Sequence, residues 1–169
     1  MRELCPDAPQ WFALSVKHQH ERPVDRILSS GGVESYLPLF RTRRRWSDRV
    51  KETESPLFPG YVFGRFPFRD RVRILNTPGV GKIVGFAGKP VPVPDQEIEN
   101  IRVALRSELP LGPWPFMRPG DRVRVDHGPL RGVEGRLSRE KSGVRLVIDV
   151  ELLQRSVAIE VDSDMLARI

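Results

Sequence analysis

The 169-residue sequence has a single cysteine, Cys5, and only three histidines. One cysteine excludes an internal disulfide and a thiolate metal cluster, which fits a reducing compartment. No stretch approaches the run of about 18 apolar residues that a membrane-spanning helix needs, and the N-terminus lacks the apolar region of an export signal. We therefore expect a cytoplasmic protein that makes no contact with a membrane.

Arrangements of residues that carry catalysis are also scarce. His18 and His20 follow the first predicted strand and His127 lies in a predicted turn, and the spacing of histidines and carboxylates matches no metal site. Ser15 and His18 do not form a recognisable nucleophile pair. We therefore expect a protein that is not an enzyme and that uses no metal or cofactor.

The overall composition is that of a folded, basic protein. Hydrophobic residues make up 39% and charged residues 30% of the chain, near the averages of globular proteins and away from those of disordered chains. Lys and Arg number 28 against 22 Asp and Glu, which gives a formal charge of +6. This positive charge favours a polyanionic partner such as nucleic acid, although basic proteins without such a partner are common.

Proline and glycine divide the chain into two domains. The stretch 110–120 carries four prolines, which cannot continue the preceding helix, predicted from Ile98, Ile101 and Leu105 at helical spacing. After this stretch the hydrophobic period switches to two. We predict a first domain over residues 1–107, a proline-rich linker over 108–118 and a second domain over 119–169.

The two domains are predicted to differ in class. In the first, strands over 11–16, 33–40, 61–66 and 81–86 alternate with helices over 21–30 and 70–75 and one after Asp95. This order indicates an α+β fold in which helices flank an antiparallel sheet, with the topology of an RNA-recognition motif. In the second, strands over 121–125, 133–137, 144–150 and 156–161 are separated by glycine turns, which indicates a small SH3-like β-barrel.

The stretch from Pro56 to Phe63 combines two prolines and a glycine with aromatic residues. One interpretation is a proline turn that leads into a core strand. The functional interpretation places Phe58 and Tyr61 on an aromatic surface that binds a partner, with Trp11 of the neighbouring strand, because aromatic residues dominate anchoring contacts.

A cluster of cations lies between the two central strands of the first domain. Six cations surround Asp48, five of them arginine, and a tryptophan lies among them. Such a combination neutralises phosphates and stacks on bases, so we predict contact with nucleic acid; a solvated hairpin tip is the alternative. The predicted contact residues are Arg41, Arg43, Arg44, Arg45, Trp46, Arg49 and Lys51.

In the second domain, residues 120–135 form two predicted strands joined by a turn that contains glycine. We interpret the glycines as part of the construction of the barrel, since they allow positive φ or close packing. Leu130 and Arg131, together with the region 148–155 that begins at Ile148, are predicted to be exposed and to contact a partner.

Taken in order, these motifs resemble the NusG family over almost the whole chain. The first domain resembles the NusG N-terminal domain, and the C-terminal domain is similar to a KOW module. The motifs of the former are Trp11-Phe12, Tyr36-Leu37-Pro38-Leu39, residues 56–63, Asn76-Thr77-Pro78-Gly79-Val80, Val84-Gly85-Phe86 and Pro92-Val93-Pro94-Asp95; those of the latter are residues 119–125 and 128–135.

This resemblance implies a monomeric transcription elongation and antitermination factor that binds RNA polymerase, suppresses pausing or termination, and recruits a partner such as NusE or Rho through its KOW domain. It implies that a hydrophobic face binds the clamp helices of the largest polymerase subunit, and that a second segment aligns with the one that touches the opposing gate loop in RfaH. The residues so implied are Trp11, Phe58, Pro59 and Tyr61 for the face and Asp70, Arg71 and Arg73 for the segment. The KOW partner would then meet the contact residues predicted above, Leu130, Arg131 and Ile148.

The sequences at 56–59 and 45–48 resemble those of the specialised RfaH and UpxY-like paralogues, in which the arginine hairpin would meet non-template DNA. Refolding of the second domain into helices, as in RfaH, is disfavoured by β-branched residues such as Val144, Val147 and Ile159. Two alternatives remain open. One is a direct binder of single-stranded RNA, because residues 60–66 partly match the central aromatic strand of an RNA-recognition motif. The other is a ribosome-associated KOW protein.

Overall fold

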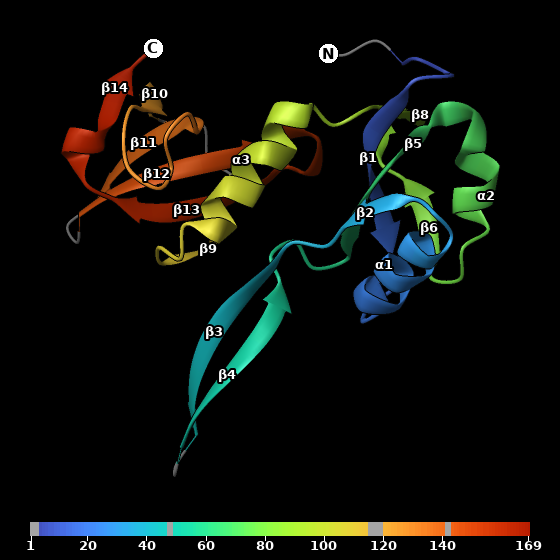
Figure 1. Cartoon of the computed structure of the whole chain (residues 1–169), viewed down its shortest axis with the longest axis horizontal. Coiled ribbons are helices and arrows are strands. Elements are labelled where there is room, and N and C mark those ends of the chain that lie inside the picture. The colour runs from blue at the N-terminus through green and yellow to red at the C-terminus, as the bar shows by residue number, and fades with distance from the viewer. Residues whose placement is uncertain (1–3, 47–48, 115–119, 141–142) are drawn as a thin grey trace. The chain divides into compact units, whose positions relative to one another are not determined.

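The computed structural model describes residues 4–46, 49–114, 120–140 and 143–169, and leaves aside the side chains of residues 44–46 and 140 (Figure 1). By their internal contacts, Met1–Pro38 and Phe58–Ile98 form one compact unit, and Leu39–Leu57 and Glu99–Ile169 form a second. The predicted first domain over 1–107 therefore differs from the first unit. The helix α3 (Asp95–Arg106) lies within the predicted first domain, but its residues from Glu99 onward belong to the second unit, because Ala104 is buried in the core of that unit.

In the described part of the chain, the first unit is built around a four-stranded antiparallel sheet with the strand order β2-β5-β1-β6. A short hairpin, β7 with β8, follows the sheet. The strands are β1 (Pro9–Val16), β2 (Glu34–Tyr36), β5 (Tyr61–Pro67), β6 (Val80–Ile83), β7 (Gly85–Phe86) and β8 (Lys89–Pro90); the helices are α1 (Glu21–Ser30), the 3-10 turn η1 (Phe68–Asp70) and α2 (Arg71–Leu75).

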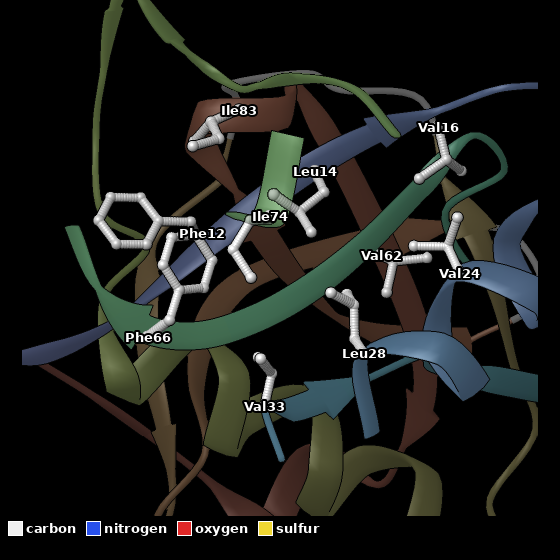
Figure 2. Close-up of a cluster of buried hydrophobic side chains, with 10 residues drawn as sticks. All are labelled: Phe12, Leu14, Val16, Val24, Leu28, Val33, Val62, Phe66, Ile74 and Ile83. Atoms are coloured by element: carbon white, nitrogen blue, oxygen red, sulfur yellow. The ribbon is translucent and has the colours of Figure 1, made fainter. Parts of the chain in front are cut away.

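The core of the first unit lies between this sheet and its helices. Alternate residues of β1, Phe12 and Leu14, share a face of the sheet and join one buried cluster with residues of α1 and α2 (Figure 2). The rings of Phe12 and Phe66 stack with centroids 4.9 Å apart. The whole cluster comprises Phe12, Leu14, Val16, Val24, Leu28, Val33, Val62, Phe66, Ile74 and Ile83. It is the α+β arrangement that the sequence predicts.

Two of the predicted strands are interrupted. The stretch 33–40 gives β2 and then the start of β3 at Leu39, with Pro38 between them, since proline has no N–H to donate to a ladder. The stretch 81–86 divides at Val84, which lies between β6 and β7; its N–H still donates to the carbonyl of Ala13 on β1, at 2.8 Å. The helix predicted over 21–30 is confirmed with those bounds.

Gly79 is required by both its backbone and its surroundings. Its φ is +97°, and a Cβ there would lie 2.9 Å from Val24 Cγ2 and 3.2 Å from His20 Cβ. We expect Gly79→Ala to lower the free energy of unfolding by about 2–4 kcal/mol, from backbone strain and overpacking together. Gly32→Ala is the matched control, because Gly32 has a φ of +79° but open space around it. Denaturant unfolding would contradict this account if the two variants lost equal stability.

A long hairpin, β3 (Leu39–Trp46) and β4 (Arg49–Pro56), forms a two-stranded sheet of its own among the described residues (Figure 1). Its register pairs Leu39 with Pro56 and Trp46 with Arg49. The predicted cation cluster therefore occupies a regular antiparallel ribbon, and residues 47–48 at its turn lie outside the described residues.

The described residues of the second unit form a six-stranded antiparallel sheet with the order β14-β10-β11-β12-β13-β9. Apolar residues that alternate along its strands make a core with Ala104 of α3. Its elements are β9 (Leu111–Trp114), β10 (Arg122–Val125), β11 (Glu134–Glu140), β12 (Gly143–Val150), the 3-10 turns η2 (Glu151–Leu153) and η3 (Ser163–Met165), β13 (Arg155–Val161) and β14 (Leu166–Arg168). A strand-rich module after an α+β unit confirms the predicted fold class.

Strand β9 occupies part of the stretch that the composition predicts as a linker. It pairs with β13, and the N–H of Glu160 donates to the carbonyl of Pro110 at 3.1 Å. Hydrogen-bonded and non-hydrogen-bonded pairs alternate along an antiparallel ladder. Pro113, opposite Val157, is in a non-hydrogen-bonded pair, so its backbone nitrogen points away from β13 and the missing N–H costs no ladder bond. The composition predicts an irregular segment because proline usually interrupts a strand. Here the prolines occupy positions that an edge strand tolerates, so a strand forms. Residues 115–118 of the predicted linker lie outside the described residues.

A polar cluster joins three strands of the second unit. Arg136 of β11 pairs with Asp149 of β12 at 2.5 Å, and the hydroxyl of Ser156 on β13 donates to Asp149 Oδ1 at 2.6 Å. The side chains of Arg136 and Asp149 are 18% and 10% exposed, and Ser156 is buried. Removing Asp149 would therefore take one acceptor away from two donors, Arg136 and Ser156, that have little access to water.

We expect Asp149→Ala to lower the unfolding free energy by about 2–4 kcal/mol, as for other pairs with little access to water. Asp121→Ala is the control, because the pair of Asp121 with Arg168 is largely exposed, and its loss should cost less than about 1 kcal/mol. Thermal unfolding of the two variants tests the comparison, and equal shifts in Tm would refute it.

Candidate functional site

The segment from Phe58 to Tyr61 forms a tight turn at the start of β5. The N–H of Tyr61 donates to the carbonyl of Phe58 at 3.2 Å, and Gly60 has a φ of +85°. Proline in the second position and a positive-φ glycine in the third are the signature of a type II turn. Pro59 is exposed and Tyr61 is half-buried, so both of these predicted contact residues reach the surface, one on each side of Gly60 in the sequence.

The prediction that Trp11 and Phe58 belong to an exposed aromatic surface is wrong for this structure. Trp11 is 3% and Phe58 is 2% exposed. Trp11 lies on β1, an interior strand of the sheet, where the consecutive apolar residues 11–14 are all buried, so residues on both faces of the strand are covered. The N–H of Val93 also donates to the carbonyl of Trp11 at 2.7 Å. Phe58 packs edge-on against the buried ring of Phe63, with centroids 6.0 Å apart.

The segment of Asp70, Arg71 and Arg73 lies on η1 and α2, as predicted for a helical turn. Arg71 and Arg73 are exposed and Asp70 is half-buried. The guanidinium of Arg71 lies 4.9 Å from the centroid of the Phe68 ring. Arg73 donates to the carbonyl of Gly31 at 3.2 Å and so ties α2 to the C-terminal end of α1, where the helix dipole favours a cation.

Two exposed apolar residues lie beside these arginines, and the sequence motifs do not single them out. Val72 is 60% and Leu75 is 40% exposed, whereas Ile74 between them is buried. Ile74 is the residue of α2 that joins the core cluster. A helical projection of α2 around Ile74 could therefore have shown that Val72 and Leu75 lie outside the core. Together with Arg71 and Arg73 they give α2 an outer face that is both apolar and cationic.

The hairpin arranges its charges differently along its length. Arg43 donates to Glu52 at 2.9 Å and Arg41 lies 3.9 Å from Glu54. The part of the hairpin farther from the turn therefore pairs opposite charges. Thr42 and Thr53 also face each other, with their hydroxyls 3.0 Å apart.

Nearer the turn of the hairpin, the register places Arg44 opposite Lys51 and Arg45 opposite Val50. Arg49 and Lys51 are exposed. The side chains of the predicted contact residues Arg44, Arg45 and Trp46 lie outside the described residues.

The predicted contact residues of the second unit are largely internal. Leu130 is 0% and Ile148 is 1% exposed, and both belong to the core cluster, so their prediction as exposed contacts is wrong. Leu130 lies in a turn in which its carbonyl accepts from the N–H of Val133 at 3.0 Å, and its side chain packs in the core. Ile148 lies on a buried position of β12. Arg131 is exposed, as predicted.

The second unit also carries a shallow cavity of 580 Å³ that no sequence motif indicates. Its apolar lining includes Pro110, Pro129, Val144 and Met165, and Arg145 also borders it. The guanidinium of Arg145 lies 4.8 Å from the centroid of the Trp114 ring, on the unexpected strand β9. Trp114 and Arg145 share a sheet only through the pairing of β9 with β13 and of β13 with β12, so no local pattern could have revealed their contact.

Among the described residues, no three or more His, Cys, Asp or Glu side chains are grouped so that they could hold a metal ion. Cys5 is exposed with a free thiol. Among the helices that the structure describes, none is both long and apolar enough to cross a membrane.

Comparisons with known proteins agree with the order of the motifs. A family model described as transcription termination factor nusG matches residues 9–102. A transcription termination/antitermination protein NusG of Lactococcus lactis is 29% identical over 167 residues, covering 90% of this chain and 89% of that protein. The protein of the same name from Pseudomonas aeruginosa is 27% identical, covering 96% of this chain and 99% of its own length.

The fold has a solved counterpart. A structure described as domain interaction in Thermotoga maritima NusG superposes with a TM-score of 0.55 at 21% identity, covering 95% of this chain and 97% of that one. At this identity the likeness concerns the fold, and it agrees with an α+β unit followed by a strand-rich module.

Proposed function

Because this chain belongs to the NusG family, we propose that it acts as a transcription elongation and antitermination factor that binds RNA polymerase. The family match over residues 9–102 carries this proposal, and it includes the turn at 58–61 and helix α2. Such a factor needs no covalent chemistry. It favours the transcribing conformation of the polymerase by binding that conformation more tightly than the paused one.

The polymerase-binding surface that we propose centres on Pro59 and Tyr61. Tyrosine offers a large apolar ring with a polar end, a combination that is common among anchoring residues of interfaces. The partner in this proposal is the pair of clamp helices of the largest subunit. Phe58 anchors the turn from within the unit through its edge-on contact with the buried ring of Phe63. Trp11 is buried in the same unit.

The outer face of α2 is the second polymerase contact in this proposal. Exposed Val72 and Leu75 supply apolar area, and Arg71 and Arg73 supply charge. A surface of this kind suits a partner segment that carries both apolar and acidic groups. In RfaH, the segment that aligns with this one touches the gate loop, across the DNA channel from the clamp.

The hairpin is proposed to meet the displaced non-template DNA. Arg49 and Lys51 are exposed on its second strand, close to the turn. Exposed cations of this kind can neutralise phosphates. The proposal that this chain is a specialised factor related to RfaH and UpxY-like proteins rests on this hairpin and on the sequence at 56–59.

The second unit is proposed to recruit a further partner of the transcription or translation machinery, NusE or Rho. Arg131 is the predicted contact residue that lies exposed on this unit. The described residues 122–125, 134–140 and 143–150 adopt strands here, in agreement with their β-branched composition.

Direct recognition of single-stranded RNA by the sheet is less well supported. An RNA-recognition motif stacks bases on exposed aromatic residues of its central strands. In this sheet Phe63 is 0% exposed and Trp11 is 3% exposed, so neither ring offers a free face to a base.

The test of the proposed function is retention of the whole chain on core RNA polymerase, followed by a transcription assay on a template with a defined pause. We expect the chain to be retained and the pause to shorten. Lack of retention on both the core enzyme and an assembled elongation complex would overturn the proposal. Tight binding to naked RNA without polymerase would favour the RNA-binding alternative instead.

A further inference from the structure

The turn at 58–61 leaves one backbone group without a partner inside the turn. A type II turn closes through the N–H of its fourth residue, here Tyr61, to the carbonyl of its first, Phe58. The N–H of the third residue, Gly60, takes no part in this closure. A polar group that is withdrawn from water needs another partner, because leaving it unpaired is costly.

That partner is a carboxylate from a different element. Glu21, in the first turn of α1, accepts a hydrogen bond from the N–H of Gly60 at 2.8 Å, across 39 residues of sequence. Glu21 is 6% exposed. A carboxylate is rarely this buried without a structural reason, since burial removes its hydration.

The second backbone group of Gly60 is also held. Its carbonyl accepts from the N–H of Val16, at the end of β1, at 2.9 Å. Helix α1 and strand β1 therefore fix the same residue from two directions. Pro59 lies exposed immediately before this anchor and Tyr61 immediately after it.

From this geometry we infer that Glu21 is a positioning residue for polymerase binding: its carboxylate holds Gly60 so that Pro59 and Tyr61 are presented in a fixed arrangement. The inference rests on the proposed function of the 58–61 turn. Glu21 itself is buried and does not need to touch the polymerase. A turn that is already ordered loses less conformational freedom on binding, and this preorganisation raises affinity.

Three variants of the full chain test the inference. Glu21→Ala removes the acceptor and should weaken binding to core polymerase by roughly tenfold. Glu21→Gln keeps a side-chain carbonyl that can accept from Gly60, so it should bind within about threefold of the wild type. If Glu21 acted only through its charge on the helix dipole, both variants would lose affinity equally, and that result would overturn the inference.

The third variant separates positioning from stability. Leu28→Ala removes a buried side chain of the same helix, 3% exposed and within the core cluster. It should lower Tm at least as much as Glu21→Ala does, and yet bind polymerase nearly as the wild type does. Parallel losses of Tm and affinity across the three variants would show that Glu21 acts through stability, and would overturn the inference.

Hydrogen exchange of the Gly60 amide, followed by NMR, gives a readout that does not depend on polymerase. We expect this amide to exchange at least roughly tenfold faster in Glu21→Ala, with the amides of β1 before Val16 unchanged. Unchanged Gly60 exchange would overturn the inference even if the chain binds polymerase. Faster Gly60 exchange together with wild-type binding by Tyr61→Ala would instead overturn the proposed surface, and with it the link from Glu21 to polymerase.

Discussion

Tyr61→Ala is expected to weaken binding to core RNA polymerase by at least about tenfold, since aromatic anchors carry much of the energy of an interface. The ring stands at the end of a turn whose backbone is held from both sides, so its binding conformation is largely present before contact. The half-buried ring contributes little to the core clusters, and we expect the unfolding free energy to change by less than about 1.5 kcal/mol. Equilibrium titration of labelled chain with polymerase gives the affinity.

Phe86→Ala is the matched control for this prediction. Phe86 is also an aromatic residue of the first unit and is 70% exposed, but it lies on the β7–β8 hairpin, away in sequence from the turn and from α2. Its loss should change affinity by less than about twofold. If Phe86→Ala weakened binding and Tyr61→Ala did not, the polymerase-binding surface would have to be moved to the β7–β8 hairpin.

A second large effect is expected from the hairpin. The double substitution Arg49→Ala with Lys51→Ala should weaken binding to single-stranded DNA by roughly five- to tenfold, and should lower the slope of log affinity against log salt by roughly 1.4. The reason is that both cations lie near the turn, where the register sets Lys51 against another cation, Arg44. Fluorescence anisotropy over a series of salt concentrations measures both quantities.

The control comes from the same hairpin and removes the same charge. Arg41 and Arg43 are engaged with Glu54 and Glu52, so a phosphate gains less from them. Arg41→Ala with Arg43→Ala should therefore change affinity and salt slope by less than half as much. Equal losses in the two double variants would indicate that net charge, and not the arrangement along the hairpin, governs binding.

Much of the fold could be predicted because its signals are local. Helix α1 has the predicted bounds, with Val24 and Leu28 buried on one face and glycine after its last residue. The period-two pattern of Arg122–Val125 gives a strand whose residues alternate between exposed and buried. Such patterns depend on residues a few positions apart, which is the range over which side-chain periodicity acts.

The candidate site could be predicted in type but not in exposure. The proline and glycine of the 58–61 turn predict a turn wherever it lies. That Phe58 is buried and Tyr61 half-exposed depends on which face of the sheet each ring meets. The same holds for Leu130 and Ile148, which are hydrophobic for the ordinary reason that they fill a core.

By itself the sequence determined the class of the two modules, the order of the family motifs and the turn chemistry at 58–61, because each of these follows from neighbouring residues. Tertiary structure decided which aromatic residues reach the surface, that Pro113 lies on the outer edge of a strand, and that the carboxylate of Glu21 meets the amide of Gly60. These facts depend on strand pairing and on burial between segments that are tens of residues apart. No local pattern of residues encodes such distances, since they are fixed only when the sheet forms and the helices pack on it.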